Sequence, residues 1–190
     1  MTGTGPLPSE HVDEIRSVAD LVLHHARTLA AAGVPTPEVD ARLLTRHVLG
    51  LDTNGIRTAP LPPDEVRAEL DELVRRRAER VPLQLLTGAT WFRFLRLECR
   101  PGVFIPRPET EVVAGLAIDA ARVAGDHPVV VEPCTGTGAI ALAVACELPG
   151  AQVLATDRSP DAVALAQDNL RHVRAGRAGV PGMAPGAPCE

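Results

Sequence analysis

The residues best suited to chemistry lie in a glycine-containing loop within residues 129–157, VVVEPCTGTGAIALAVACELPGAQVLATD. The three consecutive valines predict a strand buried on both faces, and the Ala- and Leu-rich run after the loop predicts a helix. Gly136 and Gly138 permit a tight turn and a close ligand, and Asp157 follows a second strand. Free N–H groups at a helix N-terminus favour anions, and an acid placed like Asp157 accepts ribose hydroxyls. The pattern therefore predicts a nucleotide site.

Length and composition limit the possible partners. The chain has 190 residues, enough for one large domain or two small ones, and 45% of them are apolar. A net charge of −5, 2% aromatic residues and no Tyr argue against direct nucleic-acid binding. The N-terminus carries acids and no apolar signal core, and the longest apolar run, 139–146, is too short to span a bilayer. We expect a monomeric, cytoplasmic protein with no membrane partner.

The four cysteines do not form a recognisable metal or disulfide pattern. None belongs to a C-x-x-C pair, so we expect reduced thiols and no metal site at Cys99, Cys134, Cys146 and Cys189. His24 and His25 are neighbours on a predicted helix and should point in different directions, which also argues against a metal.

Helical periodicity dominates residues 12–81, after a Pro- and Gly-rich segment, 1–11, that we expect to be flexible. Three helices are predicted, and Pro and Gly separate them. Their expected inner faces are Ile15, Val18, Val22, Ala26 and Leu29; then Val39, Leu43, Leu44, His47 and Val48; then Val66, Leu70, Leu73 and Val74. A basic cluster closes the third helix, formed by Arg75, Arg76, Arg77 and Arg80. It is interpreted as a solvated helix end, with a docking patch as the alternative.

Residues 82–105 predict a β-hairpin connector. The stretch WFRFLRLECRPGVFIP alternates in polarity and contains a Pro-Gly turn. It holds all the aromatic residues of the chain, which are Trp91, Phe92, Phe94 and Phe104. These side chains either seal a joint between the helical bundle and the next domain or line a ligand pocket. The following IPRPETEVV, residues 105–113, predicts an extended entry and then a helix.

IPRPETE, followed about twenty-five residues later by a strand and the C-T-G-T-G-A-I-A-L loop and helix, resembles the HemK-type peptide chain release factor glutamine methyltransferases. The segments AAAGVPTPEVDARLLTRHVLGL and RRRAERVPLQLLTG are similar to the N-terminal helical domain of that family. The resemblance covers roughly residues 14–172. It implies an α/β fold class, with a helical substrate-docking domain followed by a partial Rossmann-like methyltransferase domain over residues 106–172.

The resemblance also implies a cofactor, a substrate and a site. The cofactor is S-adenosylmethionine, and the acceptor is the Gln side-chain amide of the Gly-Gly-Gln motif in peptide chain release factors. The implied cofactor-binding residues are Cys134, Thr135, Gly136, Thr137, Gly138 and Asp157, and Glu132, Arg107 and Thr110 are expected beside the same pocket. Glu132 stands at the end of the strand, where the family usually has Asp.

The residues that act on the substrate are not found in this sequence. In the family, an Asn-Pro-Pro-Tyr motif in a later loop orients the acceptor amide, whose lone pair is held by resonance. This sequence has no Tyr, and neither Asn54 nor Asn169 precedes a Pro, so its catalytic residues are unknown. Residues 173–190 are rich in Gly, Pro and Ala and predict a disordered tail. We expect a C-terminally truncated protein whose two sheet strands leave apolar faces open, with little activity of its own.

Two other functions remain open from the sequence. Gly136-x-Gly138-x-x-Ala141, with Asp157 nineteen residues after Gly138, also fits the fingerprint of an NAD-dependent oxidoreductase. That interpretation leaves PRPETE unexplained. The second alternative is a non-enzymatic module, in which the helical bundle docks on a release factor.

Overall fold

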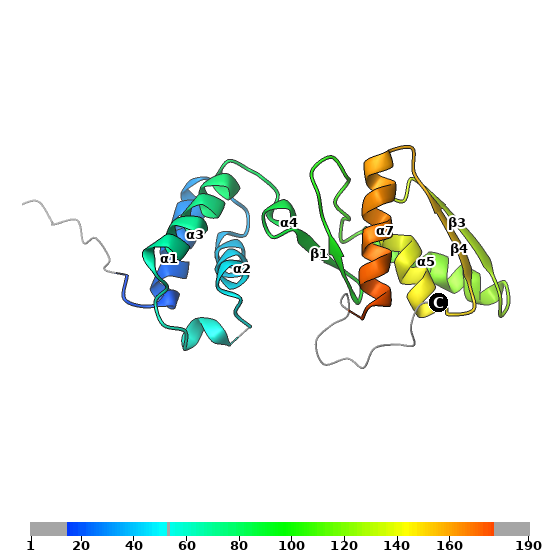
Figure 1. Cartoon of the computed structure of the whole chain (residues 1–190), viewed down its shortest axis with the longest axis horizontal. Helices are drawn as coiled ribbons and strands as arrows, with labels where there is room; N and C mark the ends of the chain where they lie inside the picture. The colour runs from blue at the N-terminus through cyan, green and yellow to red at the C-terminus, as the bar shows by residue number, and fades with distance from the viewer. Residues whose placement is uncertain (1–14, 53, 177–190) are drawn as a thin grey trace, which may run out of the picture. The chain divides into compact units, whose positions relative to one another are not determined.

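The computed structural model describes residues 15–52 and 54–176, and the chain divides into two compact units, Met1–Leu83 and Gln84–Glu190 (Figure 1). The predicted flexible segment 1–11 and residues 177–190 of the predicted tail lie outside the described residues. No helix in the described ranges is long and apolar enough to cross a membrane.

The first unit is helical. Its elements are α1 (Val18–Ala31), α2 (Pro37–Leu49), the 3-10 helix η1 (Gly55–Arg57) and α3 (Asp64–Ala78). Helix α1 begins after Ser17, whose hydroxyl accepts the Asp20 N–H at 3.2 Å, as in a capping box. Helix α2 ends at Gly50, which adopts φ +62°, and α3 begins directly after a Pro pair. Local capping chemistry thus sets the helix boundaries.

The face that α2 buries differs from the predicted one. Val39 and Leu43 are 54% and 37% exposed, and His47 is also exposed. The buried side chains of this helix are Asp40, Ala41, Leu44 and Thr45. Two of these four are polar and are satisfied internally: Thr45 donates to the Ala41 carbonyl at 2.8 Å, and Asp40 forms an ion pair. Of the predicted inner residues, Leu44 is buried and Val48 is half-buried. The prediction was wrong for Val39, Leu43 and His47, because paired polar groups occupy part of the inner face.

A buried histidine links α1 to α3. The His25 side chain is 2% exposed, and its Nε2 lies 2.7 Å from Asp71 Oδ1. Its Nδ1 is buried without a hydrogen-bond partner among the described residues. Burial lowers the pKa of His25, and the bond to Asp71 opposes this shift only partly. The folded unit therefore favours the neutral imidazole.

This histidine should make the stability of the chain depend on pH. Because the pKa of His25 is lower in the folded state, the unfolded state binds more protons once the pH falls to the unfolded value of about 6.5. Stability is fully present above that pH and is lost as the pH falls towards the lower, folded pKa. Urea unfolding followed by circular dichroism at pH 7.5 and 5 should show this loss for the wild type and much less of it for His25→Gln. His24→Gln, which changes an exposed neighbour, is the matched control; equal losses in all three proteins would contradict the assignment.

The second unit mixes strands and helices. The elements of this part of the chain are α4 (Leu83–Leu86), β1 (Ala89–Phe92), β2 (Leu95–Glu98), α5 (Thr110–Val123), β3 (Val129–Pro133), α6 (Ala139–Glu147), β4 (Gln152–Thr156) and α7 (Pro160–Arg174). Strands β1 and β2 pair antiparallel, and β3 and β4 pair in parallel, as a strand–helix–strand unit requires. Helix α7 continues past the predicted boundary at residue 172.

The hairpin turns at a different place from the predicted one. The chain reverses at Arg93 and Phe94 between β1 and β2, whereas Pro101 and Gly102 form a separate turn after β2. Arg93 adopts φ +52°, which is uncommon for a residue with a side chain. Its guanidinium forms an ion pair with Glu147, and its backbone N–H donates to Glu111 Oε1 at 3.0 Å. These contacts with α5 and α6 hold the turn without a glycine.

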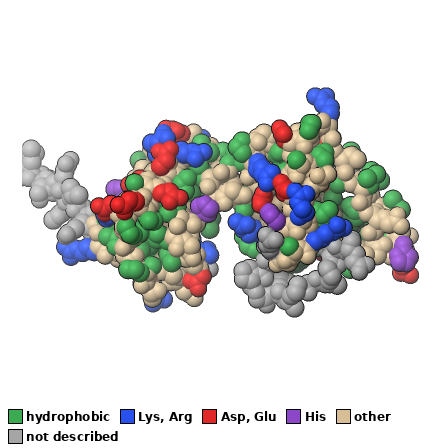
Figure 2. Space-filling view, in the orientation of Figure 1, with side chains coloured by type: hydrophobic (Ala, Val, Ile, Leu, Met, Phe, Trp, Pro, Cys, Tyr) green, Lys and Arg blue, Asp and Glu red, His purple; other side chains and the backbone are tan. Residues whose placement is uncertain are grey.

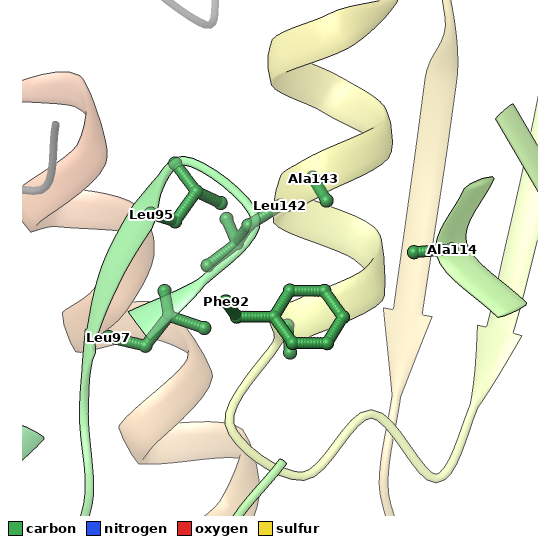
Figure 3. Close-up of a cluster of buried hydrophobic side chains, with 7 residues drawn as sticks. Phe92, Leu95, Leu97, Ala114, Leu142 and Ala143 are labelled. Carbon is green, nitrogen blue, oxygen red and sulfur yellow. The ribbon is translucent and has the colours of Figure 1, made fainter. Parts of the chain in front are cut away.

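The hairpin contributes to the core of the second unit (Figure 3). Phe92 is 1% exposed and packs with Leu95 and Leu97 of β2 against Leu142 and Ala143 of α6. Of the four aromatic side chains, only Phe92 is buried, while Trp91, Phe94 and Phe104 are 51%, 52% and 66% exposed. The hairpin is therefore part of this unit's own core.

One face of the parallel sheet is open, as expected for two strands alone and contrary to the prediction that the first strand is buried on both faces. Helix α6 packs against β3 and β4. On the opposite face, Val129, Val131 and Leu154 are 71%, 59% and 58% exposed. Figure 2 shows hydrophobic side chains on the surface of each unit. The two paired strands thus have the doubly buried composition of a larger parallel sheet but only one covered face within the described residues.

Candidate functional site

A cavity of about 440 Å³ lies in the second unit where β3, β4 and the glycine loop meet. It brings together most of the predicted site residues, namely Glu132, Cys134, Thr135, Gly136, Thr137, Asp157 and Thr110. Gly138 and Arg107 do not line it. The cavity lies beyond the carboxyl ends of the parallel strands, which is where α/β sheets bind ligands.

The loop keeps its shape through backbone bonds and two glycines. The Thr135 N–H donates to the Thr156 carbonyl at the end of β4 at 2.9 Å, and the Gly138 N–H donates to the Thr135 carbonyl at 2.9 Å. Gly138 adopts φ +84°, and a Cβ there would lie 3.2 Å from both Ala166 Cβ and Leu142 Cδ1. Gly138 therefore allows the start of α6 to pack closely against α7, and it does not line the cavity.

The Asp157 carboxylate is held in place by backbone hydrogen bonds. Its Oδ2 accepts the Gly136 N–H at 2.9 Å, and its Oδ1 accepts the Ser159 N–H at 2.9 Å. The backbone hydrogen bonds from Ser159 and Gly136 lower the pKa of Asp157, so the carboxylate stays ionised at neutral pH. A carboxylate has about four lone-pair sites, so each oxygen can accept one further hydrogen bond. The geometry suits two adjacent hydroxyl groups.

Glu132 reaches from the end of β3 into the loop. Its Oε2 accepts the Thr135 hydroxyl at 2.6 Å and the Ala141 N–H, near the start of α6, at 3.0 Å. Burial raises the pKa of Glu132, and these two hydrogen bonds oppose the rise. No described residue donates a hydrogen bond to its other oxygen. One carboxylate oxygen thus holds the loop, and the second remains available to a cationic group.

Part of the PRPETE segment lines the cavity, and another part contacts the hairpin turn. Thr110, the first residue of α5, lines the cavity, whereas Glu111 binds the Arg93 N–H of the hairpin turn. The guanidinium carbon of Arg107 lies 5.9 Å from the centre of the Phe104 ring, as in a cation–π contact. Phe104 itself lines the cavity. Of the two interpretations of the aromatic residues, a sealed joint between domains or a pocket wall, the second therefore holds for Phe104.

Several lining residues were not predicted from the sequence. They are Gly102, Val103, Pro106, Ile140, Ser159 and Ala162. Ser159 had a local signal, because Ser-Pro-Asp is typical of a helix start and the Ser159 hydroxyl does cap α7. The position of Val103 depends on packing with Ala162 and Leu165, for which no local signal exists.

The second unit is thus an α/β structure with a ligand cavity at the strand ends, and comparison with known proteins gives its relatives. Residues 20–88 match the PrmC N-terminal domain family. The release factor glutamine methyltransferase of Mycolicibacterium smegmatis is 49% identical over 142 residues, which are 75% of this chain and 50% of that protein. Those of Streptomyces coelicolor and Deinococcus radiodurans are 44% and 45% identical, each over about 80% of this chain and 54% of their own length.

These matches confirm the resemblance predicted from PRPETE and the glycine loop. The chain is related to release factor glutamine methyltransferases and carries the N-terminal domain of that family. It spans about half the length of the curated relatives that it matches.

Proposed function

We propose that the cavity of the second unit binds S-adenosylmethionine and that this unit is part of a Rossmann-like methyltransferase domain. The observation that carries the proposal is the convergence of Asp157, the loop 134–137 and Thr110 on one cavity, in a chain related to methyltransferases. A volume of about 440 Å³ lies within the usual range of about 300–1,000 Å³ for small-molecule sites.

The residues present fit the chemical groups of this cofactor. The cofactor has a zwitterionic amino-acid end and a ribose, linked through a sulfonium. Asp157 has one acceptor site left on each oxygen, which suits the two ribose hydroxyls. The free oxygen of Glu132 suits the ammonium group of the amino-acid end. Phe104 and Ile140 supply apolar lining to the same cavity.

The proposed reaction is methyl transfer to the side-chain amide of the Gln in the Gly-Gly-Gln motif of a peptide chain release factor, in the cytoplasm where translation ends. The bound cofactor supplies a methyl group already activated by the positive sulfur. The residues of this chain bind and orient the cofactor. Asp157 and Glu132 hold it in place, and the cavity wall from Gly102 to Phe104 shields one side of it. The helical unit, which carries the PrmC N-terminal domain, docks the release factor.

Binding of S-adenosylhomocysteine tests the cofactor assignment without requiring catalysis. Isothermal titration of the 190-residue chain should show one site for S-adenosylhomocysteine and at least tenfold weaker binding of NAD. Binding of NAD alone would favour the oxidoreductase interpretation instead. Because these 190 residues contain no Tyr and no Asn-Pro pair, we expect little methylation when the chain is incubated with release factor and S-adenosylmethionine. Detection of methylated Gln by mass spectrometry would contradict that expectation.

A further inference from the structure

Asn169 is a fully buried polar residue in the middle of α7 and does not line the cavity. Its side-chain amide makes three hydrogen bonds. Oδ1 accepts the Glu98 N–H at 2.7 Å, and Nδ2 donates to the Thr137 carbonyl at 2.9 Å and to the Glu98 carbonyl at 3.3 Å. All three partners are backbone groups, so their chemistry does not depend on the side chains at those positions.

The chemistry of the partners fixes the orientation of this amide. The Glu98 N–H is a donor and must face Oδ1, because an amide NH₂ group cannot accept a hydrogen bond. The carbonyls of Thr137 and Glu98 are acceptors and must face Nδ2. A side chain that offers one acceptor and two donors at this length is Asn.

The two segments joined by Asn169 lead to two parts of the cavity lining. Thr137 belongs to the glycine loop, which lines one wall. Glu98 is the last residue of β2, and a tight turn follows it. In this turn the Val103 N–H donates a hydrogen bond to the Arg100 carbonyl at 3.3 Å. The chain then forms the part of the cavity wall that contains Gly102, Val103 and Phe104. A buried amide between the two segments therefore fixes the distance between the loop and the wall after the hairpin.

We propose that Asn169 is a positioning residue for the cofactor site, and that it holds the glycine loop in register with the wall Gly102–Phe104 so that both contact the same ligand. This inference rests on the proposed binding of S-adenosylmethionine. Asn169 does not touch the cofactor and acts only through the Thr137 and Glu98 backbones. Loss of its hydrogen bonds removes the direct link between the Thr137 and Glu98 backbones, while Val103 still packs against Ala162 and Leu165 of α7.

Two substitutions separate this role from general stability. Asn169→Asp keeps the shape and the acceptor for the Glu98 N–H but directs a carboxylate oxygen at two carbonyls. Protonation of the introduced carboxyl restores one donor, and repulsion from the carbonyls raises its pKa. Asn169→Ser removes the long amide and leaves room for water, which keeps the test possible if the carboxylate prevents folding.

The experiment measures the dissociation constant of S-adenosylhomocysteine for the 190-residue chain at pH 8 and pH 5.5. Both variants should bind at least tenfold more weakly than the wild type at pH 8. Relative to the wild type at each pH, Asn169→Asp should recover a large part of its affinity at pH 5.5, and Asn169→Ser should not. Circular dichroism and the fluorescence of the single Trp, Trp91, verify folding before titration.

Ile118→Ala is the matched control. Ile118 is 1% exposed on α5 and does not line the cavity, so its truncation lowers the melting temperature of the same unit without moving the two walls. Unchanged affinity in this control together with weakened affinity in both Asn169 variants supports the inference. If both Asn169 variants bind S-adenosylhomocysteine within twofold of the wild-type affinity, the inference about Asn169 is overturned while the proposed cofactor site stands. Absence of binding by the wild type overturns the proposed cofactor site and this inference with it.

Discussion

Asp157→Asn should weaken the binding of S-adenosylhomocysteine about a hundredfold or more. Both oxygens of Asp157 accept backbone N–H groups, at 2.9 Å each, and one of them would be replaced by an NH₂ group that faces a donor. The substitution also removes the negative charge that strengthens hydrogen bonds from two ribose hydroxyls. Two hydrogen bonds to a charged acceptor together account for a change of about this size. Isothermal titration at pH 7.5 measures the change directly.

Asp161→Asn provides the comparison for this result. Asp161 is an exposed acid in the first turn of α7, close to Asp157 in sequence, and it does not line the cavity. Its loss removes one negative charge near the site without removing an acceptor from it. The control should bind within about twofold of the wild type. Equal affinities for wild type, Asp157→Asn and Asp161→Asn would remove Asp157 from the site.

The parts of the site that could be predicted from sequence are those set by local chain geometry. Two strands joined through one helix must run parallel, so the residues after each strand, the loop 134–137 and Asp157, meet at one edge. The prediction of Glu132 beside the pocket has the same origin, since it ends β3. Its observed partners, the Thr135 hydroxyl and the Ala141 N–H, depend on a side-chain rotamer that sequence spacing does not specify.

The parts that could not be predicted depend on contacts between distant segments. Asn169 reaches Glu98 and Thr137, which lie 71 and 32 residues away in sequence. A mid-helix Asn has low helix propensity and ordinarily indicates a solvated position, so its burial is a property of the tertiary structure. The hairpin turn is a similar case. Arg93 adopts a positive φ because Glu111 and Glu147 hold it there, and the Pro-Gly pair that is typical of a turn lies elsewhere.

Buried polar pairs explain the errors in the first unit. The expectation that apolar residues point inward placed Val39 and Leu43 in the core and interpreted Arg77 as part of a solvated basic cluster. In the structure, Arg77 is 15% exposed and its Nε lies 2.7 Å from Asp40 Oδ2, whose side chain is 6% exposed. Arg75, two positions earlier, forms exposed ion pairs with Glu72 and Glu79. Within this cluster, Arg77 thus belongs to a buried pair and Arg75 to an exposed network, and these two should differ widely in their contribution to stability.

Asp40→Ala should lower the free energy of unfolding of the helical unit by about 3–5 kcal/mol, because it leaves the largely buried Arg77 guanidinium without its ionic partner. Among the described residues, only the hydrogen bond to the Val81 carbonyl then remains to Arg77. The substitution also removes the acceptor of the Thr36 hydroxyl, at 3.0 Å from Asp40 Oδ1. A loss of this size is a large share of the stability of a small domain. Urea unfolding followed by circular dichroism should show an earlier transition. The fluorescence of Trp91, which lies on β1 in the other unit, should keep its wild-type midpoint if the two units unfold independently.

Two further variants separate charge burial from loss of contacts. Glu72→Ala removes an exposed partner of Arg75 on the same unit and should leave the transition almost unchanged. The double variant Asp40→Leu with Arg77→Met replaces both buried charges by apolar groups, so it should be clearly more stable than Asp40→Ala. If the double variant unfolds at as low a urea concentration as Asp40→Ala, the unpaired charge of Arg77 is not the cause of the lost stability. The lost hydrogen bond from Thr36 or the local packing of α2 is then the cause.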